Sequence, residues 1–273
     1  MNVPKKTLNN GVIIPMIGLG TWRLEGEVCH DSILHALKAG YTSFDTAKVY
    51  ENEEYVGRAL KDCGVPREEL FVTTKLWNTD QGYDNTLKAF EVSMRKLELD
   101  VLDLYLVHWP GKTLFKDTWK AMEKLYGEGR IRAIGVSNFM PHHLQALLQS
   151  AEVTPAVNQL ESHPYLRQRA AEEYCAENGI LVEAWSPLMR GETALNDPVI
   201  KEIADAHGKT SAQVILNWHV SQGRRIIPRS SNKDRIAENL RIFDFELSRD
   251  ETAKINSLAD KGVRTGPDPE VFF

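Results

Sequence analysis

The chain has 273 residues, of which 42% are hydrophobic and 26% are charged, and its formal net charge is −5. These values are typical of a soluble globular enzyme, and the length suits one large α/β domain. Because the charge is acidic and the sequence has no block of basic residues, we expect neither nucleic acid nor an anionic membrane as the main partner.

The cysteines and the apolar segments bear on metals, disulfides and location. The three cysteines, Cys29, Cys63 and Cys175, form no C-x-x-C pair, so we expect neither a disulfide framework nor a metal site. No apolar run approaches the roughly 20 residues of a membrane helix. No apolar segment of the kind found in signal peptides follows Met1. The expected location is the reducing cytoplasm.

Short apolar segments alternate with helical patterns along the chain. Asn10-Gly11, between two such segments, predicts a type I′ β-hairpin at the N-terminus. Eight further strands are predicted, at residues 16–21, 43–45, 71–75, 101–107, 133–137, 157–160, 181–185 and 225–228. Helices are predicted between and after them, at residues 28–39, 53–63, 84–97, 117–128, 141–149, 172–177, 198–206, 212–221, 233–240 and 250–258.

This alternation favours an α/β fold of the (β/α)8 TIM barrel type, with an N-terminal β-hairpin and extra C-terminal helices. A doubly wound dinucleotide fold is disfavoured, because the third glycine of its fingerprint, after Gly18 and Gly20, would fall at Arg23. No linker or composition shift interrupts the sequence, so residues 1–273 are predicted to form a single domain.

Polar side chains stand at the ends of the predicted strands, where barrel enzymes place their catalytic groups. Asp45 and Tyr50 follow the second barrel strand. Lys75 ends the third strand, and His108 follows the fourth. Taken singly, Asp45 could equally be a helix cap, and a lone histidine such as His108 is more often a satisfied core residue. Together they suggest chemistry, because a lysine is rarely buried unless it is paired.

The four residues suggest an acid catalyst. A carboxylate would keep the lysine charged, and the lysine would lower the pKa of the phenol of Tyr50. An imidazole nearby would hold a carbonyl oxygen by a hydrogen bond. Together the four residues would form an acid catalyst that protonates a carbonyl oxygen of the substrate while a hydride arrives at the carbonyl carbon.

The segment from Arg229 to Arg235, after the last predicted strand, is predicted to bind an anion. It opens a helix whose N-terminus favours negative charge, and guanidinium groups bind phosphate through paired hydrogen bonds. The alternative is a capped helix with a solvated basic face. Trp185, at the end of the seventh strand, would either stack on a flat ring or belong to the core.

With these motifs in place, the sequence resembles the aldo-keto reductase superfamily along essentially its whole length. The matching segments include Phe44-Asp45-Thr46-Ala47, Thr74-Lys75-Leu76-Trp77, Val107-His108-Trp109-Pro110, Val136-Ser137-Asn138-Phe139, Asn158-Gln159, Trp185-Ser186-Pro187-Leu188 and Ile227-Pro228-Arg229-Ser230. Residues 78–83 and 266–269 resemble the microbial branch that contains 2,5-diketo-D-gluconate reductases, methylglyoxal reductases and protozoal prostaglandin F synthases.

The resemblance implies an NADPH-dependent reductase of aldehydes and ketones. Tyr50 would be the general acid, Lys75 and Asp45 would tune it, and His108 would orient the substrate carbonyl. The implied cofactor-binding residues are Ser137, Asn138, Gln159 and Trp185 at the nicotinamide, Ser186 and Leu188 at the pyrophosphate, Arg229, Ser230 and Arg235 at the 2′-phosphate, and Glu238 and Asn239 near the adenine. The implied substrate pocket is lined by Trp22, Trp77 and Trp109.

One departure from the family pattern and one short loop bear on specificity. Arg229 stands where the family usually has lysine, and because a guanidinium also binds phosphate, the NADPH preference is expected to survive. The loop over residues 111–116 is short, which suggests an open pocket that accepts methylglyoxal, keto sugars and aromatic aldehydes. Relatives of this kind are commonly monomeric, and we expect a monomer.

Three other functions stay open at this point. One is a Schiff-base lyase or aldolase that uses Lys75, although it would leave the anion site without a purpose. Another is a prostaglandin F synthase-type endoperoxide reductase. The third is a cofactor-binding sensor with little turnover, which would be expected to lack part of the catalytic set.

Overall fold

The computed structural model describes residues 3–191 and 193–272, and its chain begins with a β-hairpin. Strands β1 (Lys5–Thr7) and β2 (Ile13–Pro15) pair antiparallel. The predicted hairpin is confirmed, but its predicted turn type is wrong. Gly11 has a φ of 85°, whereas Asn10 is not among the residues with positive φ, and a type I′ turn requires positive φ at both positions.

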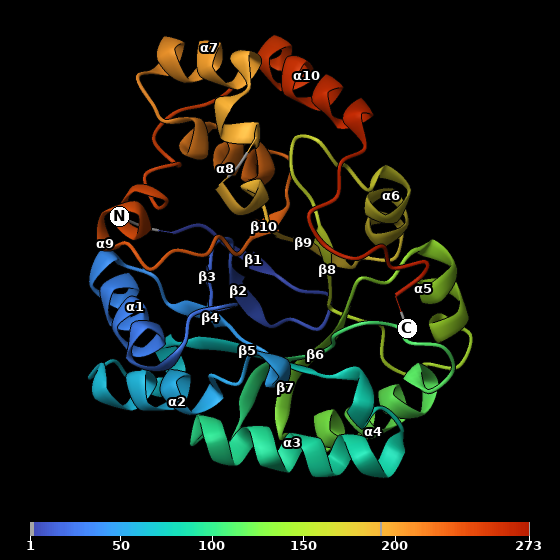
Figure 1. The fold of residues 1–273 in the computed structure, drawn as a ribbon. Coiled ribbons are helices and arrows are strands. Elements are labelled where there is room, and N and C mark those ends of the chain that lie inside the picture. The colour runs from blue at the N-terminus through green and yellow to red at the C-terminus, as the bar shows by residue number, and fades with distance from the viewer. Residues whose placement is uncertain (1–2, 192, 273) are drawn as a thin grey trace.

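The other strands form one parallel sheet of eight, in chain order from β3 to β10 (Figure 1). They are β3 (Leu19–Gly20), β4 (Ser43–Asp45), β5 (Phe71–Leu76), β6 (Leu102–Val107), β7 (Ile131–Ser137), β8 (Val157–Glu161), β9 (Leu181–Trp185) and β10 (Arg225–Ile226). A parallel bridge between Ile17 and Ile226 joins the two edges, and the amide of Gly18 donates to the carbonyl of Ile226 over 2.9 Å. The predicted (β/α)8 barrel with its N-terminal hairpin is confirmed.

Helices follow the strands and surround the barrel in Figure 1. The α-helices are α1 (Gly26–Ala39), α2 (Glu53–Asp62), α3 (Tyr83–Leu97), α4 (Phe115–Gly127), α5 (Pro141–Leu148), α6 (Arg169–Glu177), α7 (Pro198–His207), α8 (Ser211–Ser221), α9 (Lys233–Glu238) and α10 (Arg249–Ser257). The short 3-10 helices are η1 (Lys48–Tyr50), η2 (Arg67–Glu69), η3 (Asn78–Asp80), η4 (Met189–Gly191), η5 (Thr193–Asn196) and η6 (Leu258–Lys261). Among the described residues, none of these helices is long and apolar enough to cross a membrane.

The predicted extra helices near the C-terminus are confirmed as α7 and α10, which lie together at one side of the barrel (Figure 1). They share an apolar cluster with α8 that is separate from the main core, and Ile203, Trp218 and Ile255 belong to it. Their starts follow the rules for helix N-termini. The side chain of Asp197 accepts from the amide of Val199, and α8 and α10 each begin with a capping box.

The two ends of the barrel differ in character. At the amino ends of the strands, the hairpin residues Leu8 and Ile14 pack with Phe71, Leu104 and Leu181 in a buried apolar cluster. The hairpin therefore closes this end of the barrel. The carboxyl ends of the strands stay available for polar groups, as in other barrels of this type.

The last strand is shorter than the predicted range 225–228, because β10 ends at Ile226. Ile227 still donates its amide to the carbonyl of Ala184 over 3.3 Å, but Pro228 has no amide hydrogen to continue the ladder. The chain therefore leaves the sheet just before Arg229.

Candidate active site

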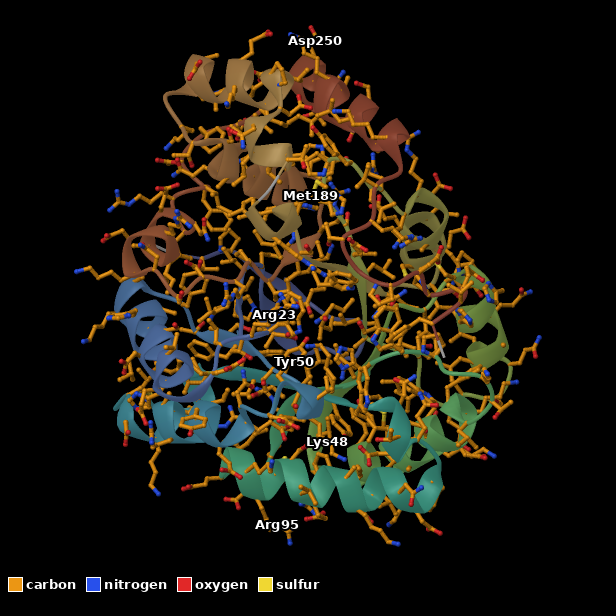
Figure 2. The ribbon with its side chains drawn as sticks, in the orientation of Figure 1. Arg23, Lys48, Tyr50, Arg95, Met189 and Asp250 are labelled. Atoms are coloured by element: carbon orange, nitrogen blue, oxygen red, sulfur yellow. The ribbon has the colours of Figure 1, made fainter. Side chains whose placement is uncertain are left out.

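Asp45, Tyr50 and Lys75 are joined by hydrogen bonds at the carboxyl ends of neighbouring strands. Asp45 ends β4, Tyr50 ends the short helix η1, and Lys75 lies near the end of β5. The ammonium of Lys75 donates to Asp45 Oδ1 over 2.5 Å, to the Thr46 carbonyl over 2.9 Å and to the Tyr50 hydroxyl over 3.4 Å. Asp45 and Lys75 are buried, whereas Tyr50 is half-buried and lies over the middle of the ring of helices in Figure 2.

The pKa of Tyr50 is raised, which differs from the expected direction. Burial raises the pKa of the phenol and Asp45 raises it further, and together they outweigh the lowering caused by the charge of Lys75. Burial alone would lower the pKa of Lys75, but the negative charge of Asp45 and the interactions with the Tyr50 oxygen more than offset this, so that pKa is also raised. The phenol and the ammonium are therefore both protonated at neutral pH.

His108 directly follows β6 and contacts the phenol ring. Its imidazole meets the Tyr50 ring edge-on with centroids 5.8 Å apart, and the Trp77 ring with centroids 5.2 Å apart. Burial, and next the charge of Lys75, hold the pKa of His108 well below its usual range. The imidazole is therefore neutral near pH 7, and one of its nitrogens carries a hydrogen that a carbonyl oxygen can accept.

A connected set of polar side chains from the next strands lies beside these residues. Ser137 Oγ donates to the carbonyl of Gln159 over 2.9 Å. Asn138 Nδ2 donates to the His108 carbonyl and to Ser137 Oγ, each over 3.0 Å. Asn138 Oδ1 accepts from Trp185 Nε1 over 2.9 Å. The structure thus brings together the four residues that the sequence predicted for a nicotinamide, next to the His108 main chain.

The C-terminal segment contacts Trp185 and Ser186, which the sequence did not predict. Ser186 Oγ and Thr265 Oγ1 are 3.1 Å apart. A Cβ atom added to Gly266 would overlap the ring of Trp185, so only glycine allows this approach. Glu161, which is buried, accepts from the Thr265 hydroxyl over 2.6 Å and from the Gly266 amide over 3.3 Å. Glu161 therefore anchors the segment against Trp185 and Ser186.

The three tryptophans predicted for the substrate pocket have different surroundings. Trp77 lies against His108, which also contacts Tyr50. Trp109 is buried and packs on Phe272 with ring centroids 4.5 Å apart. Trp22 is 37% exposed and contacts Arg23 and Arg190, whose guanidinium carbons are 4.3 and 4.9 Å from its ring centroid.

The segment after β10 supplies the predicted cationic groups. Arg229 and Arg235 are exposed, and Arg229 donates to the Arg23 carbonyl over 2.9 Å. Arg229 precedes α9 and Arg235 lies in its first turn. This helix is shorter than predicted, since α9 ends at Glu238, and Asn232 Oδ1 already accepts from two of its first amides. The predicted contribution of the helix N-terminus to anion binding is therefore reduced, and side chains have to provide most of it.

The remaining predicted residues lie near this segment or beside Trp185. Ser230 is buried and its Oγ accepts from the amide of Asn232 over 3.1 Å. Glu238 accepts from the hydroxyl of Thr210 over 2.7 Å, and Asn239 is buried. Leu188 is half-buried and packs on both the main core and the cluster of the extra helices.

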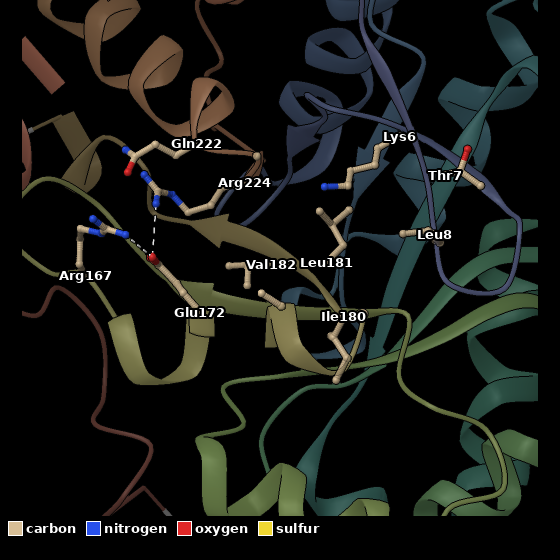
Figure 3. A pocket seen from close by; sticks show the side chains of 13 residues that line it. Lys6, Thr7, Leu8, Arg167, Glu172, Ile180, Leu181, Val182, Gln222 and Arg224 are labelled. Atoms are coloured by element: carbon tan, nitrogen blue, oxygen red, sulfur yellow. Dashed lines mark hydrogen bonds and ion pairs between the residues drawn. The ribbon is translucent and has the colours of Figure 1, made fainter. Parts of the chain in front are cut away.

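A hollow of about 380 Å³ at the other end of the barrel contains none of the predicted site residues (Figure 3). Lys6 of β1, Leu181 at the start of β9 and Arg224 before β10 line it. Arg224 and Arg167 both pair with Glu172 there. Both of these arginines therefore have a partner within the chain, and the hollow lies away from the carboxyl ends of the strands.

Comparison with known proteins identifies the class. Residues 16–260 match the aldo/keto reductase family. The chain belongs to this family and is an oxidoreductase.

Similar proteins include reductases of small carbonyls. The chain is 54% identical over 264 residues to a glyoxal reductase of Bacillus subtilis, and the matched region covers 96% of this chain and 95% of that protein. It is 50% identical to the 9,11-endoperoxide prostaglandin H2 reductase of Trypanosoma cruzi, and the matched region covers 98% of this chain and 95% of that protein. Among solved structures, a point mutant of Gox0644 in complex with NADPH is 42% identical, with a TM-score of 0.95 and 100% of both chains covered.

Proposed function

We propose that this enzyme uses NADPH to reduce aldehydes and ketones to alcohols, with Tyr50 as the proton donor. The observation that carries the proposal is the ammonium of Lys75, which lies 2.5 Å from Asp45 Oδ1 and 3.4 Å from the Tyr50 hydroxyl. The similar proteins named as glyoxal and prostaglandin H2 reductases support it. When bound, the cofactor would supply the hydride that reaches the carbonyl carbon.

The four catalytic residues have separate roles in this proposal. Neutral His108 donates a hydrogen bond to the carbonyl oxygen and orients it beside Tyr50. Tyr50 then transfers its proton to the oxygen as negative charge develops there. The nearby Lys75 ammonium stabilises the phenolate that remains, and Asp45 keeps the ammonium charged and in place.

The cofactor would extend from the nicotinamide wall to the segment after β10. Ser137, Asn138, Gln159 and Trp185 form the wall. Ser186 and Leu188 would follow the pyrophosphate, Arg229, Ser230 and Arg235 would bind the 2′-phosphate, and Glu238 and Asn239 would lie near the adenine. The two exposed guanidinium groups suit a doubly charged phosphate, because each offers several donors in a planar fork.

A Schiff-base mechanism at Lys75 is disfavoured by the same geometry. The ammonium is buried, has three acceptors within 3.4 Å and has a raised pKa. An amine held in its protonated form is a poor nucleophile. We therefore assign Lys75 an electrostatic role and no covalent role.

The direct test is NADPH oxidation by the purified chain with a panel of carbonyls. The panel contains methylglyoxal, a keto sugar, a nitrobenzaldehyde and a prostaglandin endoperoxide, and the last member tests the second candidate function suggested by the T. cruzi relative. We expect turnover with several small aldehydes. Tight NADPH binding without turnover on any member would contradict the proposal and favour a cofactor sensor.

Replacing Arg235 by alanine tests the assigned 2′-phosphate site. We expect the Kd of NADPH to rise about 10- to 100-fold and that of NADH to change little, because a hydrogen bond to a charged group contributes about 1.5–3 kcal/mol. Arg241→Ala is the matched control, since it removes another exposed arginine six positions further on. Equal losses for NADPH and NADH in Arg235→Ala would refute the role.

The raised pKa of Tyr50 and the lowered pKa of His108 predict the pH profile of reduction. The donor is the protonated phenol, which is lost only above its pKa, and burial moves that loss to higher pH. The imidazole becomes charged only in acid. We expect kcat/KM for an aldehyde that does not ionise to stay nearly constant between about pH 7 and pH 9. A decline centred near neutral pH would contradict these assignments.

We also propose that the chain works as one domain and as a monomer, because a single chain supplies all of the residues assigned above. The proposed location is the cytoplasm. Sedimentation at micromolar concentration measures the oligomeric state directly.

A further inference from the structure

A second charged pair lies inside the barrel below the catalytic residues. Glu183 of β9 and Arg225 of β10 are register partners in the parallel sheet and form an ion pair. Both side chains are 0% exposed. Burying two charges carries a large desolvation cost, and apolar residues would fill the same space at less cost. The pair therefore calls for an explanation beyond stability.

The guanidinium of Arg225 is held from several sides. Its Nε donates to the Pro15 carbonyl over 2.7 Å, and its Nη2 donates to Ser43 Oγ over 2.5 Å. Gly18 leaves room for it, because a Cβ atom there would lie 2.7 Å from Nη2. Arg225 thus links the closed end of the barrel to Glu183 and fixes that carboxylate.

Gln159 lies between two carboxylates. Its Nε2 donates to Asp45 Oδ2 over 2.9 Å and also to Glu183 Oε1. Ionised carboxylates only accept hydrogen bonds, so the amino end of the amide has to face them. Both of its hydrogens are then used, and Oε1 remains as the acceptor at the nicotinamide wall.

We propose that Glu183 and Arg225 are positioning residues that hold the Gln159 amide with its oxygen toward the carboxamide amino group of the cofactor. This inference rests on the proposed function. Arg225 holds the Glu183 carboxylate in place through the ion pair, and this carboxylate, as an acceptor, prevents the amide from turning over. Without it, only Asp45 would define the amide orientation.

The probe is the 3-acetylpyridine analogue of NADPH, in which a methyl group replaces the amino group of the carboxamide. This analogue cannot donate a hydrogen bond to Gln159 Oε1. We expect wild-type protein to bind NADPH about tenfold more tightly than the analogue, as one lost hydrogen bond would give. The ratio of the two Kd values therefore reports the orientation of the Gln159 amide.

Glu183→Gln is the isosteric test. Because Arg225 only donates, the new amide has to turn its oxygen to Arg225 and its amino group to Gln159. Two amino groups then face each other, and we expect the Kd ratio to fall to about twofold or less. The double variant Glu183→Leu/Arg225→Met removes both charges together, and the same fall is expected there if the isosteric variant does not fold.

Asp103→Asn is the matched control. Asp103 is also a buried carboxylate paired with arginines, Arg67 and Arg132, but it has no contact with Gln159. The Asp103→Asn variant should have a lower melting temperature than wild-type protein and keep the wild-type Kd ratio. A ratio that stays near tenfold in both Glu183 variants would overturn the inference, and so would a wild-type ratio near one. Failure of wild-type protein to bind either cofactor would instead overturn the proposed function.

Discussion

Replacing Tyr50 by phenylalanine is expected to lower kcat by about 100- to 10,000-fold while the Kd of NADPH stays unchanged. The change removes only the hydroxyl oxygen, which lies 3.4 Å from the Lys75 ammonium. The ring and its edge contact with His108 remain, so the pocket keeps its shape. Steady-state reduction of methylglyoxal and fluorescence titration with NADPH measure the two quantities separately.

Tyr55→Phe is the matched control for this variant. Tyr55 lies on the next helix, α2, where its ring contacts Arg58 and not Lys75. The Tyr55→Phe variant should retain the wild-type kcat. If Tyr50→Phe also kept most of its activity, another group would have to deliver the proton, and the assignment of the catalytic residues would fail.

The cluster that we propose as catalytic was predictable, because a barrel places the carboxyl ends of its strands at one rim. Asp45, Lys75 and His108 could each be read as a polar residue at the end of an apolar segment, and the structure brings them together as expected. The wall of Ser137, Asn138, Gln159 and Trp185 followed from the family resemblance, and the structure joins these residues by hydrogen bonds.

The Glu183–Arg225 pair had a weaker signal in the sequence. A charged residue within each of two strands predicted to be buried was visible, but their register was not. The link between Glu161 and Thr265 spans 104 positions, and no local pattern indicates a contact at such a distance. The direction of the Tyr50 pKa shift was also out of reach, since it depends on burial that opposes the lysine charge.

Replacing Lys75 by methionine is expected to lower both kcat and stability. We expect kcat to fall at least about 100-fold, because the phenolate of Tyr50 loses the cation that stabilises it. We expect the free energy of unfolding to fall by about 3–5 kcal/mol, because Asp45 is 1% exposed and would be left as a buried charge without its ion-pair partner. Urea unfolding and steady-state kinetics measure the two losses.

The double variant Asp45→Asn/Lys75→Met separates the two roles of the lysine. It removes both charges of the pair, so most of the lost stability should return, as found when a buried ion pair is replaced as a unit. Activity should stay low, because the cation beside the Tyr50 hydroxyl is still missing. Recovery of kcat together with stability would mean that Lys75 serves the fold alone, and the proton of Tyr50 would then be transferred without its help.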